Sequence, residues 1–159
     1  MNGHREIHRN KTRLDAVFAR AKGSFENLEI QSDYARYLCV LVSGFFENAV
    51  VDLILDYTAK RSASQVSSFV ESALDRWTNL NVEKLIQLLA SFEPRWRDKA
   101  SDFLVDSRKD HLNGLVALRH KVVHGESVGI TISQIGQYYR TIVEIVEFVD
   151  FTLSELAVS

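Results

Sequence analysis

Residues 34–57 read YARYLCVLVSGFFENAVVDLILDY, and they carry the strongest structural signal in the sequence. Its apolar side chains recur at steps of three, four or one residue, which is the periodicity of an α-helix. The positions that share this pattern are Tyr34, Leu38, Leu41, Val42, Phe45, Phe46, Ala49, Val50, Leu53, Ile54 and Tyr57. Such a wide apolar face predicts a central helix that is covered by other helices on several sides.

A second long helix is predicted near the C-terminus. Thr131 followed by Gln134 has the pattern of a capping box, which marks a helix start. Apolar residues then follow at alternating steps of four and three: Ile135, Tyr139, Ile142, Val146, Val149 and Leu153. This spacing suits the packing of helices in a bundle.

Shorter helices are expected in the remaining segments. The first covers about 11–22, with Gly23 near its end. The second runs from an N-cap at Ser62 or Ser64 to about Trp77. Two more begin near Asn81 and near Pro94. The chain has only one proline and seven glycines, although sheet-rich folds use both for turns. We therefore expect an all-α fold, an antiparallel helical bundle of four core helices with short extra helices.

The segment 107–124 is expected to form a further helix. Ser107 followed by Asp110 resembles a capping arrangement at its start. Gly125 can take the left-handed conformation that commonly ends a helix. The helix would therefore end directly after His124.

Arg119 lies in an unusual place on this helix. On a helical wheel it projects from the middle of an apolar group formed by Leu112, Leu115, Val116, Val122 and Val123. A guanidinium in such a stripe is unfavourable unless a carboxylate, a phosphate or several carbonyl groups receive it. Two interpretations stay open: a structural arginine paired with an acid, or an anion site that faces a cleft or a subunit interface.

His120 and His124 are neighbours on the flank of the same stripe, four residues apart. Helical zinc sites use this spacing but need further ligands. The chain has no second cysteine, no glutamate within the pair and no histidine after His124. We expect neither a metal nor another cofactor.

Charge divides the chain unevenly. The formal net charge is −2, yet residues 1–22 hold six basic side chains against Glu6 and Asp15, so the rest carries −6. We predict a basic N-terminal arm with a short helix over 1–31 and a helical bundle over 32–157. The arm either contacts phosphates or is a solvated terminus.

Location is inferred from cysteine and hydropathy. The single cysteine, Cys39, cannot form an internal disulfide and reads as a small buried residue. The first residues are polar without the apolar core of a signal peptide, and no uninterrupted apolar run approaches membrane-spanning length. We therefore expect a cytoplasmic protein.

Several segments resemble one family. Arg119-x4-His124, with polar His120 after the arginine, is similar to the R-x4–6-H motif of HEPN domains. YLCVLVSGFFE at 37–47, LRHKVVHGES at 118–127 and QYY at 137–139 resemble the RiboL-PSP-type HEPN group. The similarity is expected to span about Ser32 to Leu156, so the N-terminal arm would inherit nothing from the family.

The resemblance implies a function. Many HEPN proteins are metal-independent endoribonucleases of defence, abortive-infection or toxin–antitoxin systems. By this resemblance Arg119 and His124 are the catalytic pair, His120 supports them, and Glu47 is placed to hold Arg119 or is a solvated acid. RNA is the expected substrate, a homodimer through 119–124 the expected assembly, and an antitoxin or other protein a further partner.

Two other functions remain under consideration. The first is a HEPN module without catalysis that binds RNA, nucleotide or a partner protein. The second is a helical scaffold in which Arg119 only joins helices. Fold alone does not choose among these functions.

Overall fold

A computed structural model describes residues 2–22 and 27–155. This part of the chain forms seven helices and no strand, which confirms the predicted all-α fold. The helices are α1 (Asn2–Ala21), α2 (Leu28–Ala59), α3 (Ser64–Leu74), α4 (Val82–Phe92), α5 (Trp96–Phe103), α6 (Asp106–Val123) and α7 (Ile132–Glu155).

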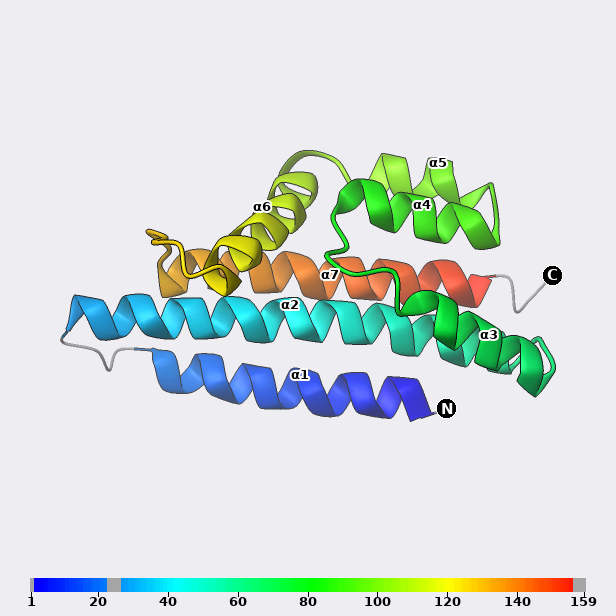
Figure 1. Ribbon diagram of the computed structural model, residues 1–159, viewed down its shortest axis with the longest axis horizontal. Coiled ribbons are helices and arrows are strands. Elements are labelled where there is room, and N and C mark those ends of the chain that lie inside the picture. Colours follow the sequence, from blue (N-terminus) through cyan, green and yellow to red (C-terminus); the bar gives the residue numbers. More distant parts are fainter. Residues whose placement is uncertain (1, 23–26, 156–159) are drawn as a thin grey trace.

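The four long helices, α1, α2, α6 and α7, form the bundle, and successive ones run in opposite directions (Figure 1). Helix α2 packs against the other three. Helix α6 lies obliquely across the bundle. The short helices α4 and α5 form a hairpin over the C-terminal half of α7, and α4 also contacts α6 (Figure 1). The hairpin and α6 therefore lie next to each other on the same side of the bundle.

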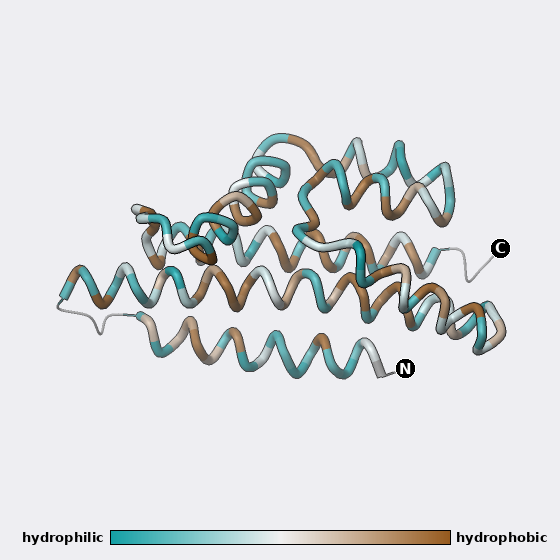
Figure 2. The backbone as a smooth tube through the Cα atoms, viewed as in Figure 1, coloured by the Kyte–Doolittle hydropathy of each residue, from teal (hydrophilic) through white to brown (hydrophobic). Residues whose placement is uncertain are grey.

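Helix α2 is the central helix that its sequence predicts. Eight of the eleven predicted apolar positions are buried, and the other three are Tyr34, Leu41 and Tyr57, which are partly buried against the core. Figure 2 shows the hydrophobic residues that follow α2 along its length. By length and composition alone α2 would suffice to cross a membrane, but here its apolar faces pack against other helices.

Helix α1 differs from the expected short helix at 11–22, because it begins nine residues earlier and packs along α2 (Figure 1). Single side chains, such as His4 with Asp150, join it to α7. Polar residues surround its apolar ones, but Ile7, Leu14 and Phe18 recur at helical spacing and contact the core. The glycine at position 3 allows a close approach, since an added Cβ would lie 3.0 Å from the backbone oxygen of Asp52. The predicted helix end at Gly23 lies outside the described residues.

Two predicted helix starts are confirmed. The Thr131 amide donates to Gln134 Oε1 at 3.0 Å, and the Gln134 amide donates to Thr131 Oγ1 at 3.1 Å, which completes the capping box of α7. The side chain of Asn81 caps α4 by accepting from the Lys84 amide at 2.9 Å. These caps use short local contacts, which the sequence pattern describes directly.

Two other predicted caps are not formed. Helix α3 begins at Ser64 after Ala63, and its N-cap has no side-chain hydrogen bond. Helix α6 begins at Asp106, before Ser107, and its N-cap is Val105, again without a side-chain hydrogen bond. Only Leu104 and Val105 connect α5 to α6, and the first residue of α6, Asp106, has a positive φ of 49°. The helix therefore begins directly after this short turn.

Tyr139 joins α7 to α1. Its hydroxyl donates to Asp15 Oδ1 at 2.6 Å, and its ring stacks on Phe18 with centroids 4.9 Å apart. Burial alone would raise the pKa of the Asp15 carboxyl, but hydrogen bonds from Lys11 and Tyr139 outweigh it and lower the pKa. This carboxyl therefore stabilises the fold above its unfolded pKa, and the contribution is lost as the pH falls through the folded pKa.

We expect Tyr139→Phe to lower the free energy of unfolding by about 1 kcal/mol at pH 7, a modest value because Asp15 is exposed to solvent. The ring stack on Phe18 is kept, so only the hydrogen bond is tested. Urea unfolding at pH 7 and near pH 3 measures the difference, which should shrink at the lower pH. An equal difference at both values would contradict the assignment.

Candidate active site at the C-terminal end of α6

The end of α6 is closed by two backbone hydrogen bonds. The Gly125 amide donates to the Val122 carbonyl at 3.1 Å, and the Glu126 amide donates to the Lys121 carbonyl at 2.9 Å. Gly125 has a φ of 72°, the left-handed conformation that its position predicts. His124 is the C-cap and is exposed to solvent. The chain therefore leaves the helix just after the last residue of the motif.

Arg119 reaches from α6 toward the loop between α3 and α4. It is partly buried, and its Nη1 donates to Asn79 Oδ1 at 2.7 Å. Within residues 2–22 and 27–155, no carboxylate lies within ion-pair distance of it. The guanidinium is thus held by a neutral amide oxygen. Of the two interpretations left open by the helical wheel, an arginine paired with an internal acid does not describe this structure.

Glu47 does not pair with Arg119 directly. Its Oε1 accepts a hydrogen bond from the Asn79 backbone amide at 2.6 Å, and Asn79 then contacts Arg119 through its side chain. A carboxylate that accepts from a backbone amide fixes the position of that backbone. Glu47 on α2 therefore orients Arg119 on α6 through Asn79.

Asn79 is the site residue that sequence reasoning missed. It lies 40 residues before Arg119, in a loop without a recognisable motif. Its φ of 53° is left-handed, and asparagine tolerates this conformation better than most residues. Near Asn79 the sequence offers only the two asparagines ahead of α4, Asn79 and Asn81. They indicate a turn and a helix cap, but they do not predict a contact with the motif.

For the RNA cleavage that the family resemblance implies, we expect Asn79→Gly to lower the rate by roughly tenfold, because the guanidinium loses its acceptor and its fixed position. Glycine accepts the left-handed backbone, so the change removes the amide without adding strain. The rate with saturating RNA and the thermal midpoint should be measured together. A large loss of stability with unchanged cleavage would show that Asn79 only holds the fold.

His120 and His124 lie side by side at the end of α6. Their ring centroids are 4.3 Å apart, and both residues are exposed. In the part of the chain that the structure describes, no three His, Cys, Asp or Glu residues are grouped to hold a metal ion. The pair therefore offers imidazoles for proton transfer or phosphate contact.

Arg119 and His124 leave α6 in different directions. Five residues along an α-helix correspond to a rotation of about 140° between the two side chains. Arg119 turns inward to Asn79, whereas His124 is exposed at the helix end. One subunit thus presents the two groups on neighbouring faces of α6.

Cys39 lies on α2 close enough to Arg119 for the positive charge to act on its thiol. Burial raises the pKa of this thiol to about 11, because the Ser43 hydroxyl and the nearby guanidinium offset the effect of burial only in part. The thiol is fully buried, as its apolar surroundings in the sequence predict. It is therefore neutral at physiological pH and unsuited to act as a nucleophile.

We expect thiol-specific reagents to modify Cys39 at pH 8 only as fast as the protein opens. Addition of denaturant should increase the labelling rate steeply, because it exposes the side chain and restores its ordinary acidity. Mass spectrometry of alkylated protein gives the rate. Rapid labelling of the native protein would show that the region beside Arg119 opens readily.

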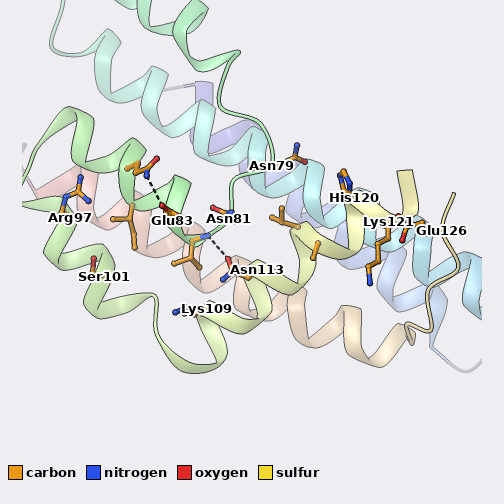
Figure 3. A pocket seen from close by; sticks show the side chains of 15 residues that line it. Asn79, Asn81, Glu83, Arg97, Ser101, Lys109, Asn113, His120, Lys121 and Glu126 are labelled. Carbon is orange, nitrogen blue, oxygen red and sulfur yellow. Dashed lines mark hydrogen bonds between the residues drawn. The ribbon is translucent and has the colours of Figure 1, made fainter. Parts of the chain in front are cut away.

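A groove adjoins the motif between α6 and the α4–α5 hairpin. Its volume is about 870 Å³. Asn79, His120 and Lys121 lie toward one end, and Arg97 and Ser101 toward the other (Figure 3). Arg119 and His124 are not part of its lining, but Asn79 and His120 each contact one of them. The groove therefore leads to the motif.

The chain matches the model of a known protein family. The family model described as RiboL-PSP-HEPN matches residues 6–155. The match includes α1 from Glu6 onward, so the expected start of the similarity at Ser32 was wrong. No curated protein and no solved structure gives a significant match. The match covers the motif, Glu47 and Asn79 together.

Proposed function

We propose that this chain, which belongs to the RiboL-PSP type of the HEPN family, is a metal-independent endoribonuclease. Family membership points to a function on RNA or nucleotides. Cleavage of RNA is the finer proposal, with defence, abortive infection or toxin–antitoxin control as its setting. An antitoxin or another protein partner in the cytoplasm would fit that setting.

The state of Arg119 is the observation that carries the proposal. A guanidinium paired with an internal carboxylate would have much of its charge neutralised. Here the described structure supplies one neutral amide oxygen instead, and the side chain is only partly buried. Its positive charge is therefore available to a phosphate.

The chemistry needs no metal ion, because the 2′-hydroxyl of RNA is the nucleophile. The 2′-oxygen attacks the adjacent phosphorus while an imidazole of His124 takes its proton. Arg119 stabilises the added negative charge of the phosphorane. The bond to the 5′-oxygen then breaks, and that oxygen gains a proton. The products are a 2′,3′-cyclic phosphate and a 5′-hydroxyl.

A homodimer would complete this site. Arg119 and His124 point about 140° apart on one helix, so two copies of α6 related by a two-fold axis can bring one group from each subunit to the same phosphate. Val123 lies directly before His124 and is 62% exposed. Burial of this side chain in a subunit contact would be favourable.

A binding module without catalysis is the second candidate. It is favoured by the separation of Arg119 and His124 within one subunit, together with the adjoining groove, which many polar and charged side chains line. In that case the same residues would hold RNA, nucleotide or a partner protein. Direct measurement of cleavage distinguishes it from the nuclease.

Incubation of the purified protein with RNA in excess EDTA tests the ribonuclease proposal. We expect cleavage to continue and the fragments to carry cyclic phosphate and 5′-hydroxyl ends. An otherwise identical oligomer with 2′-deoxy sugars should stay intact, since its nucleophile is missing. Products with 5′-phosphate ends, or activity that requires added metal, would contradict the mechanism.

A further inference from the structure

We propose that the groove between α6 and the α4–α5 hairpin binds the sugar–phosphate backbone of single-stranded RNA beside the cleaved phosphate. This inference rests on the proposed ribonuclease function and adds to it the place and chemistry of a substrate subsite. The groove ends at Asn79, which holds Arg119, and at His120, which contacts His124. A strand that follows the groove therefore arrives at the motif.

The length of the groove fits a few nucleotides. Along α6 it extends from Lys109 to Lys121, which is about 18 Å at the rise of an α-helix. Figure 3 shows Arg97 and Ser101 of α5 near one end and Lys121 near the other. The cationic residues are thus distributed along the groove, as contacts with successive phosphates require.

Pairing of cations in this region depends on the side they face. Arg95, Lys99 and Arg108, which do not line the groove, form ion pairs with Glu93, Glu155 and Glu144. The three cations that line it, Arg97, Lys109 and Lys121, are exposed, and their side chains form no hydrogen bond or ion pair with another described residue. The unpaired positive charges therefore face the groove.

Acids also line the groove, but they are fewer. Glu83 accepts a hydrogen bond from Gln87, and Glu126 lies near the motif end. Three cations against these two acids leave a positive balance, although the whole chain has a net charge of −2. A phosphate backbone is attracted to this local balance and can avoid the acids by following the cations.

Two amide side chains that line the groove add donors. Asn113 Oδ1 accepts from the Val82 amide at 3.0 Å (Figure 3). Asn81 Oδ1 accepts from the Lys84 amide at 2.9 Å. With both oxygens fixed at the start of α4, each side chain is left with an NH₂ group that can only donate. Phosphate and ribose oxygens are suitable acceptors for these groups.

Over the described ranges, the groove lacks the large aromatic rings on which single-stranded bases commonly stack. No Phe, Tyr or Trp of the described residues lines it, so bases cannot stack there on large aromatic rings. Backbone contacts give affinity with strong salt dependence and little base preference. We therefore expect flanking nucleotides to be bound with weak sequence preference.

Fluorescence anisotropy with a single-stranded DNA oligomer of about 12 nucleotides tests the groove, because it presents the phosphates but cannot be cut. The variant Arg97→Gln/Lys109→Gln should bind roughly tenfold more weakly at low salt. Its slope of log affinity against log salt should fall in magnitude by about 1.4, at about 0.7 for each lost phosphate contact.

The matched control is Arg5→Gln/Arg13→Gln, which removes two exposed cations from α1, on the other side of the bundle (Figure 1). It should leave affinity and slope unchanged. Equal affinity of wild type and the groove variant, or a larger effect of the α1 variant, would overturn the proposal. Duplex RNA that competes as well as a single strand would also overturn it.

The two proposals fail separately in this design. Binding of the DNA oligomer needs no catalysis, so a groove-dependent affinity without any RNA cleavage would reject the ribonuclease and support the binding module. Cleavage that continues at the wild-type rate in the groove variant at low RNA concentration would reject the groove as a substrate subsite. Circular dichroism of each variant confirms that the fold is kept.

Discussion

Arg119→Ala and His124→Ala are each expected to lower the rate of RNA cleavage by at least about a hundredfold. In the proposed mechanism, the first removes the charge that stabilises the phosphorane, and the second removes the group that transfers the proton. Both groups act on the transition state, so the maximal rate should fall more than the affinity for RNA.

Stability measurements separate this result from a structural effect. Arg119 neutralises no internal carboxylate in the described structure, so its removal leaves only Asn79 Oδ1 without a donor. We expect a loss of about 1 kcal/mol in the free energy of unfolding. If Arg119→Ala mainly unfolds the protein and a refolded sample still cuts RNA, the arginine is a structural residue and the scaffold function gains.

Conservative variants sharpen the test. Arg119→Lys keeps the charge but loses the planar fork of donors, and we expect it to restore only part of the rate. Arg108→Gln is the matched control, since Arg108 lies on the same helix and pairs with Glu144 outside the motif. It should leave cleavage close to the wild-type rate, which would show that loss of a cation from α6 is not enough.

Much of the fold could be predicted because its signals are local or periodic. The apolar face of α2, the Thr131–Gln134 capping box and the left-handed Gly125 each depend on residues within a few turns of one another. Helix α1 was predicted too short because its apolar positions are sparse. In the folded protein its first nine residues are stabilised as helix by packing on α2 and by contacts such as His4 with Asp150 of α7.

The candidate site was predictable only in part. Arg119 stood out because a cation interrupts an apolar stripe, and that observation uses one helix alone. The contact with Asn79 joins residues 40 positions apart, and Glu47 lies a further 32 positions before Asn79. No spacing rule connects such positions, so the sequence left Glu47 as either a partner of Arg119 or a solvated acid, whereas the structure places Asn79 between the two.

Mixing Arg119→Ala with His124→Ala is expected to restore cleavage that neither variant has alone. If each site takes Arg119 from one subunit and His124 from the other, a mixed dimer contains one intact site and one site that lacks both groups. Random exchange between equal amounts of the variants makes half of the dimers mixed, so about a quarter of the wild-type activity should return.

The recovery depends on assembly alone, which makes it specific for a shared site. A catalytic centre contained within one subunit would give no recovery at any ratio of the two variants, because every subunit lacks one of its groups. The control is the double variant Arg119→Ala/His124→Ala mixed with wild type. Each site of such a mixed dimer lacks either the arginine or the histidine, so mixing should restore no activity. If dimers that are shown to exchange subunits recover no activity, each site takes both groups from the same subunit. Helix α6 would then have to unwind near Gly125 for His124 to reach the phosphate held by Arg119.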